Sequence, residues 1–134
     1  REVISTIQTD VSSVSSNGNR EIAEICTAMR ESLSRLEEAT TWILESATRD
    51  PRLPLAASFH YLMLWGTVAG GWQMTRSAGA AVKRMEQESE QQFFHAKLLS
   101  ACCYVRYVLP TSTARYAAIV SGSELVARFD SSSF

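Results

Sequence analysis

Histidine is the first residue type to examine for metal or acid–base chemistry, and this 134-residue sequence has two, His60 and His95. A catalytic zinc ion usually takes three protein ligands and a structural one takes four. The residues three positions before the histidines are Ala57 and Gln92, so the Glu-x-x-His pair of di-iron bundles is absent. We therefore predict no metal site and expect both histidines to be ordinary hydrogen-bonded side chains.

Cysteine is the next candidate for chemistry, and the three cysteines are Cys26, Cys102 and Cys103. An odd number of cysteines does not form a disulfide framework. A nucleophilic thiolate needs a base and an orienting partner, and Arg106 is the one basic residue close to the pair. We expect Cys102 in the core, Cys103 partly exposed, and reduced, inert thiols in a cytoplasmic protein.

Paired carboxylates occur at Glu37-Glu38 and at Glu86, Glu88 and Glu90, within polar runs typical of a solvated surface. They give no indication of acid–base catalysis, so we predict no catalytic residue. Lys and Arg number 13 against 14 Asp and Glu, a net charge of −1. A nucleic-acid partner is not expected, because such binding depends on neutralising phosphates with excess cations.

A glycine-rich string, Gly66-Thr-Val-Ala-Gly70-Gly71, is the most unusual feature. Each glycine inside a helix costs about 1 kcal/mol relative to alanine, so something must offset that cost. Gly66 and Gly70 lie one above the other on a helix, which lets another helix approach closely. We predict a helix-packing role for Gly66, Gly70, Gly71 and Trp72. Leucine at Gly66 or Gly70 is expected to destabilise the fold by more than about 1 kcal/mol.

Helical spacing of apolar residues dominates the first 50 positions. The first predicted helix has the stripe Val3, Ile4, Ile7, Val11 and Val14. Gly18 suits a left-handed stop, and Asn17 or Asn19 suits the next N-cap. The second helix, about 20–49, has the stripe Ile22, Ile25, Cys26, Met29, Leu33, Leu36, Thr40, Ile43, Leu44 and Ala47. Spacing that alternates three and four is typical of an antiparallel bundle.

The third predicted helix, about 56–87, is apolar nearly all round from Phe59 to Trp72. That pattern indicates a central helix covered on several sides, with a membrane span as the alternative. Ser89 and Gln92 have capping-box spacing and predict a new helix start. The fourth helix, about 90–109, has the stripe Phe94, Leu98, Ala101, Cys102, Val105, Val108 and Leu109.

Beyond Pro110, residues 112–121 predict a short helix that Gly122 ends, and residues 124–129 a further helical turn or a docking segment. The whole pattern predicts an all-α fold over residues 1–134, treated as a single domain. Its architecture is an up-down four-helix bundle with a short additional C-terminal helix.

A family resemblance is carried by Tyr61-Leu-Met-Leu-Trp-Gly-Thr-Val-Ala-Gly-Gly-Trp72, followed by Arg76 and Ala78. This stretch resembles the C-terminal helical extension of certain bacterial acyl-CoA dehydrogenases. The later Phe93-Phe94-His95-Ala96-Lys97, with Ala101, Tyr104, Leu109 and Pro110, is similar to the next helix of that domain. Residues before Tyr61 match only loosely, and Trp65 and the cysteine pair depart from the pattern.

The resemblance implies an enzyme that oxidises an acyl-CoA thioester between its α and β carbons, in fatty acid metabolism. In that family a glutamate removes the α proton and FAD accepts the β hydride. Both belong to a catalytic core outside residues 1–134, so no residue here inherits a catalytic or cofactor-binding role. The chain alone is expected to be inactive and to support assembly. Its implied partners are the catalytic core of the same polypeptide and further copies in a homo-oligomer.

Two other classes of function stay open. A stand-alone helical interaction module would expose a contiguous apolar patch of several hundred Å². A membrane-surface attachment domain would place a basic face beside apolar residues, and Arg76, Lys83 and Arg84 are its candidates. We do not expect a membrane partner.

Overall fold

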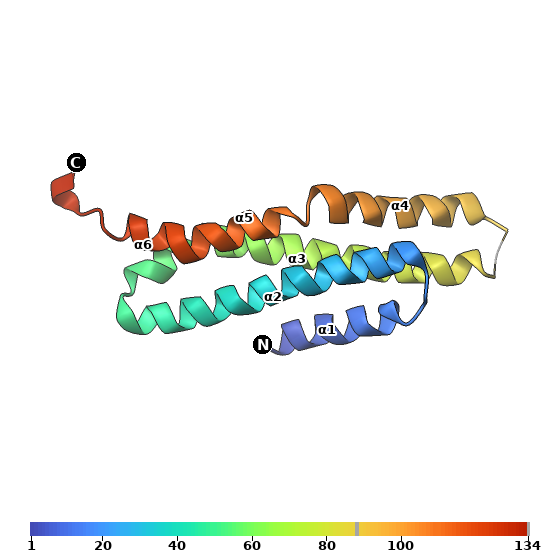
Figure 1. Cartoon of the computed structure of the whole chain (residues 1–134), viewed down its shortest axis with the longest axis horizontal. Coiled ribbons are helices and arrows are strands. Elements are labelled where there is room, and N and C mark those ends of the chain that lie inside the picture. Colours follow the sequence, from blue (N-terminus) through green and yellow to red (C-terminus); the bar gives the residue numbers. More distant parts are fainter. Residues whose placement is uncertain (88, 134) are drawn as a thin grey trace.

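Four helices run alternately up and down along one axis in the computed structural model, which describes residues 1–87 and 89–133 (Figure 1). They are α1 (Glu2–Ser15), α2 (Arg20–Arg49), α3 (Arg52–Met85) and α4 (Gln91–Tyr107). The described residues contain no strand. The predicted all-α, up-down four-helix bundle is therefore confirmed.

A line of short helical segments follows α4 and runs along α3, towards the end where α3 begins (Figure 1). It consists of α5 (Thr111–Ala117), the π-helical turn η1 (Ala118–Gly122) and α6 (Ser123–Val126). The short 3₁₀ turn η2 (Ser131–Ser133) follows. The prediction that Gly122 ends the helix is wrong: its φ of −70° and ψ of −38° are right-handed helical values, so the chain continues through it.

The turn between α1 and α2 follows the sequence pattern closely. Gly18 has a φ of 76°, a left-handed conformation that glycine adopts without steric cost. The Asn19 side chain then accepts hydrogen bonds from the backbone N–H groups of Glu21 and Ile22, at 2.9 and 3.2 Å. Both the predicted stop at Gly18 and the predicted N-cap at Asn19 are confirmed.

The start of α3 differs from prediction, whereas the start of α4 agrees with it except for the cap. α3 begins at Arg52 rather than 56 because Pro54 lies in the first turn, where its missing N–H leaves no bond unmade. The Asp50 carboxylate accepts from the Arg52 backbone N–H at 2.9 Å at this start. α4 begins at Gln91, close to the predicted start at about 90, but its N-cap is Glu90 with no side-chain cap, so the capping box predicted from Ser89 is wrong.

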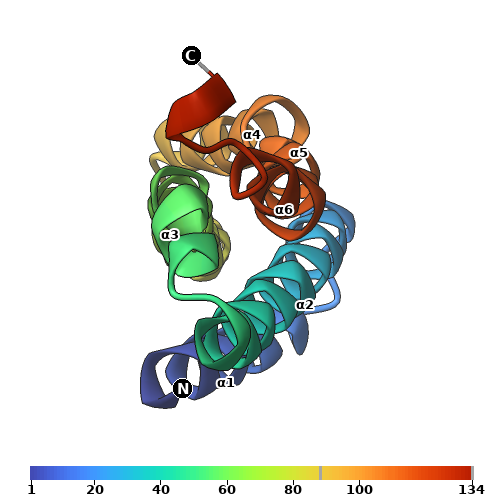
Figure 2. The same cartoon turned by 90° about the vertical axis from the view of Figure 1, so that its left-hand side faces the viewer.

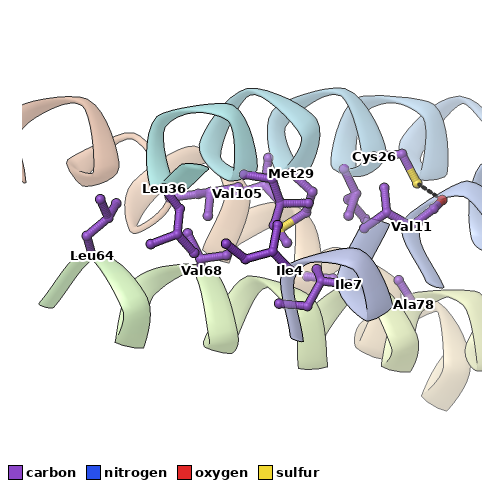
Figure 3. Packing of buried hydrophobic residues seen from close by; sticks show 14 of the residues in the cluster. Ile4, Ile7, Val11, Cys26, Met29, Leu36, Leu64, Val68, Ala78 and Val105 are labelled. Atoms are coloured by element: carbon purple, nitrogen blue, oxygen red, sulfur yellow. Dashed lines mark hydrogen bonds between the residues drawn. The ribbon is translucent and has the colours of Figure 1, made fainter. Parts of the chain in front are cut away.

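The core lies where α1, α2, α3 and α4 face one another, and Figure 3 shows apolar side chains from these helices meeting there. Among the fully buried side chains are Ile7, Met29, Leu36, Leu64 and Val68. Four predicted core residues are instead exposed, namely Val3, Leu44, Ala47 and Val108.

The length of α1 accounts for two of these errors. The start of α1 lies beside the middle of α2, where Gln8 donates to Glu37 at 2.8 Å. The last turns of α2 therefore extend past α1, and Leu44 and Ala47 meet solvent. Val108 is exposed because it follows the last residue of α4, where the chain changes direction.

The first half of α3 also departs from prediction. α3 contacts α1, α2, α4 and α5, as expected for a central helix. Its outward side, however, has no helix against it in the end-on view (Figure 2). Leu55, Phe59 and Leu62 of α3 are exposed, so the prediction of a helix covered on several sides holds for only part of its circumference.

Candidate functional site

His60 is a half-buried side chain that joins α3 to α5. The Arg115 guanidinium donates to its Nδ1 at 3.0 Å, which requires the neutral imidazole to carry its proton on Nε2. Arg115 also lies over the Phe59 ring, 5.5 Å from the centroid. His95 is exposed on α4. Within residues 1–87 and 89–133, no group of three or more His, Cys, Asp or Glu is placed to hold a metal ion.

The three thiols lie in different environments. Cys26 is buried and contacts the Val11 carbonyl oxygen at 3.6 Å, and burial raises its pKa. Burial also raises the pKa of Cys102, and neighbouring carboxylates add to the effect. Raising a thiol pKa lowers its reactivity at neutral pH. Cys103 is exposed, rather than partly exposed as predicted.

The described carboxylates of the two acidic runs lie at the surface. Glu37 accepts from Gln8 of α1, and Glu38 accepts from the Ser34 hydroxyl at 3.1 Å. Glu86 and Glu90 are exposed, and Glu88 lies outside the described residues.

Glu24 carries a carboxylate that sequence analysis did not single out, and it forms an ion pair between two helices. Glu24 of α2 accepts two hydrogen bonds from the Arg106 guanidinium of α4, at 2.7 and 3.0 Å. This pairing holds the pKa of Glu24 below its usual range. The pair ties two helices together at the surface.

The three glycines of the α3 string have different surroundings. A methyl group at Gly70 would overlap the Tyr104 hydroxyl, which donates to the Thr67 carbonyl oxygen at 2.8 Å. A methyl at Gly71 would come within 2.5 Å of the Met29 sulfur. A methyl at Gly66 would meet nothing within 4 Å. The structure thus leaves room for a partner side chain at Gly70 and Gly71, but Gly66 has no neighbour to accommodate.

Trp72 is half-buried and links α3 to α1. Its indole Nε1–H donates to the Asp10 carboxylate at 2.7 Å, and the Arg76 guanidinium lies 5.8 Å from its ring centroid. Sequence analysis selected Trp72 but missed Asp10, because the two residues are 62 positions apart. Tyr104 was missed as the partner of Gly70 for the same reason.

A groove of about 410 Å³ lies beside this contact, between α1 and α3. Its lining residues are Asp10, Ser13, Val14, Ser16, Asn17, Arg76, Gly79, Ala80 and Lys83. This set contains hydroxyls, one carboxylate and two cations, but no thiol and no histidine. It can hold polar groups, but its Asp10 carboxylate accepts from Trp72 and its Ser16 hydroxyl donates to the Ser13 carbonyl oxygen.

The family of this chain is identified by comparing its sequence with known protein families. A sequence model of the family described as "Acetyl-CoA dehydrogenase C-terminal like" matches residues 2–130. The chain belongs to this family. The match includes all of α1 to α6, so the resemblance seen at residues 61–110 is confirmed and extends to the preceding helices as well.

One relative of this C-terminal-like domain is the 3-methylmercaptopropionyl-CoA dehydrogenase of Ruegeria pomeroyi. The two sequences are 29% identical over 104 residues, which is 78% of this chain and 18% of the relative. The chain thus spans less than a fifth of the length of that enzyme. Among the described residues, no helix has the length and apolar character to cross a membrane.

Proposed function

We propose that this chain is the C-terminal domain of an FAD-dependent acyl-CoA dehydrogenase, an enzyme that oxidises an acyl-CoA thioester between its α and β carbons. The observation that carries the proposal is the family match over residues 2–130. The domain has a structural and assembly role and contributes no catalytic residue. Its partners are the catalytic core of the same polypeptide and further copies of the enzyme, in the cytoplasm.

The polar side chains of the chain support this role, because several of them hold helices together. Trp72 bonds α1, and Tyr104 of α4 bonds the α3 backbone. His60 of α3 is engaged by Arg115 of α5. Side chains used in this way fix the geometry of the bundle.

FAD belongs in the core under this proposal. The residues that line the groove between α1 and α3 include no aromatic side chain for an isoalloxazine ring to stack on. They also place the Asp10 carboxylate where the negatively charged pyrophosphate would have to lie alongside Arg76 and Lys83. We therefore assign the flavin no site in this groove.

The test compares three proteins: the longer polypeptide that contains this chain, the same polypeptide truncated before Arg1, and the 134-residue chain alone. Each is assayed for bound flavin by its absorption spectrum and for acyl-CoA-dependent reduction of an artificial electron acceptor. We expect flavin in the first two and neither property in the third. Flavin binding or turnover by the chain alone would overturn the proposal, and so would a longer polypeptide without flavin.

An interaction module is the second candidate, and the exposed apolar side of α3 favours it. Membrane attachment has less support. The basic residues Arg76, Lys83 and Arg84 lie in the second half of α3, and Arg76 faces Asp10 at 4.0 Å. About 15 Å of helix separates Arg76 from the apolar residues that end near Gly66, so the basic and apolar surfaces do not coincide.

A further inference from the structure

A groove of about 340 Å³ lies where α2 meets the segment formed by α5 and η1. Its walls combine carboxylates with aromatic and aliphatic surface, and they include Glu37, Glu38, Glu45, Trp42, Tyr116 and Val120. Among the described residues that line this groove, none is Lys, Arg or His. The groove therefore surrounds apolar surface with charge of one sign.

The spacing of residues on α2 explains why these groups gather there. Trp42 follows Glu38 by four positions and Glu45 follows Trp42 by three, so the three side chains share one side of the helix. Trp42 and Tyr116 are both half-buried and pack against the core. Packing therefore holds the two rings in place, while part of their surface still lines the groove.

The carboxylates of the groove have neutral hydrogen-bond donors. Glu37 accepts from the Gln8 amide at 2.8 Å, and Glu38 accepts from the Ser34 hydroxyl at 3.1 Å. Hydrogen bonding to the Glu38 carboxylate also raises the pKa of the Tyr116 hydroxyl. In the part of the chain that the structure describes, no carboxylate of this groove forms an ion pair. Their negative charge is therefore not balanced within the groove.

The cations of α2 near the groove have other partners. Arg35 donates to the Glu31 carbonyl oxygen at 3.3 Å. Arg49 follows Glu45 by one helical turn, but its guanidinium lies 3.7 Å from the Glu124 carboxylate of α6. Neither arginine lines the groove, so a cation that neutralises it has to come from outside these contacts.

We propose that this groove binds a guanidinium group, carried either by a free organic cation or by an arginine side chain of a partner protein. A guanidinium is planar, so it stacks on aromatic rings such as those of Trp42 and Tyr116. Its N–H groups form a fork that donates to carboxylates, and three of these line the groove. The proposal goes beyond the assembly role of the domain and does not depend on it.

The expected affinity is low, because the three carboxylates are exposed to solvent. Ion pairs and cation–π contacts at exposed sites are each weak, although a cleft lined by one sign of charge raises the local concentration of counter-ions. We therefore expect a single guanidinium to bind with a Kd of about 1–10 mM.

Nuclear magnetic resonance titration of the indole N–H signals tests the proposal. The chain has three tryptophans, and Trp42→Phe identifies the signal that comes from the groove. At constant ionic strength, n-butylguanidinium should move the Trp42 signal in a saturable way, whereas n-butylurea, its neutral planar analogue, should not. The Trp72 signal should stay in place, because its N–H already donates to Asp10 at 2.7 Å outside the groove.

Charge-removing variants locate the binding on the groove. Glu45→Gln should weaken binding of n-butylguanidinium roughly twofold to fivefold, the range for one exposed ion pair, and adding Glu38→Gln should bring the loss to about tenfold. Glu31→Gln, the same change on α2 outside the groove, is the matched control and should leave the Kd unchanged. Circular dichroism verifies that each variant is folded.

A short peptide with one central arginine distinguishes the two sources of the guanidinium. Tighter binding than that of n-butylguanidinium assigns the groove to a segment of a partner protein, and equal or weaker binding assigns it to a free cation. A Trp42 signal that n-butylguanidinium leaves in place overturns the proposal. It is equally overturned if n-butylurea moves the signal as far, or if Glu31→Gln weakens binding as much as Glu45→Gln.

Discussion

Replacing Gly70 with alanine should destabilise the bundle, whereas the same change at Gly66 should stabilise it. Both glycines lie inside α3, where alanine is favoured by about 0.5–1 kcal/mol because glycine loses more backbone entropy. The new methyl at Gly66 meets nothing within 4 Å, so that gain is realised in full. At Gly66 the expected sign is opposite to the one predicted from the sequence, whereas at Gly70 it is the same.

At Gly70 the methyl would overlap the Tyr104 hydroxyl and come within 2.9 Å of the ring carbon that carries it. The phenol must move, which breaks its 2.8 Å hydrogen bond to the Thr67 carbonyl oxygen. A lost hydrogen bond costs about 0.5–1.5 kcal/mol, and overpacking a half-buried contact costs about 1–3 kcal/mol. After the helix-propensity gain of about 0.5–1 kcal/mol, we expect a net loss of about 2 kcal/mol, the middle of a range of about 0.5–4 kcal/mol.

Urea and thermal unfolding of the two variants measure the difference. We expect about 2–3 kcal/mol between them, or roughly 6–12 °C in Tm for a chain of this length. Adding Tyr104→Phe to Gly70→Ala should recover part of the loss, because it removes the atom that clashes, whereas adding it to Gly66→Ala should bring no such recovery. If Gly70→Ala is as stable as Gly66→Ala, the close approach of Tyr104 to α3 is not what requires glycine.

Three further outcomes follow from the contacts described. Asp10→Asn should lower the free energy of unfolding by about 1–2 kcal/mol in urea titrations, because the Trp72 indole then donates to a neutral acceptor. The Glu24 carboxylate has a lowered pKa because Arg106 donates to it, so its contribution to stability is present above its ordinary pKa of 4.5 and lost as pH falls through the lowered value. Glu24→Gln should therefore reduce stability at pH 7 but not in strong acid, and added salt should shrink the difference. Thiol titration should find one fast-reacting group, and Cys103→Ser should abolish it, while the two buried thiols react only after unfolding.

Local patterns in the sequence were sufficient to predict where most helices begin and end. Gly18 and Asn19 end one helix and begin the next through backbone conformation and a side-chain cap, which are decided within a few residues. Apolar spacing likewise located α2 at its observed bounds. Gly122 shows the limit of such rules, because glycine permits a left-handed stop without requiring one, and packing against α3 continues the helix through it.

Which side of a helix is covered could not be decided locally. The spacing of apolar residues is the same whether a helix, a second molecule or water lies against them. The sequence therefore gave no sign that Leu44 and Leu62 are exposed. Their exposure depends on the length of α1 and on the placement of the four rods, which are properties of the whole chain. The partners Asp10 and Tyr104 likewise lie 62 and 37 positions from the residues they bond. The amino-acid sequence alone thus determined the helices and the family, whereas tertiary packing decided which glycine has a neighbour and which face of α3 has none.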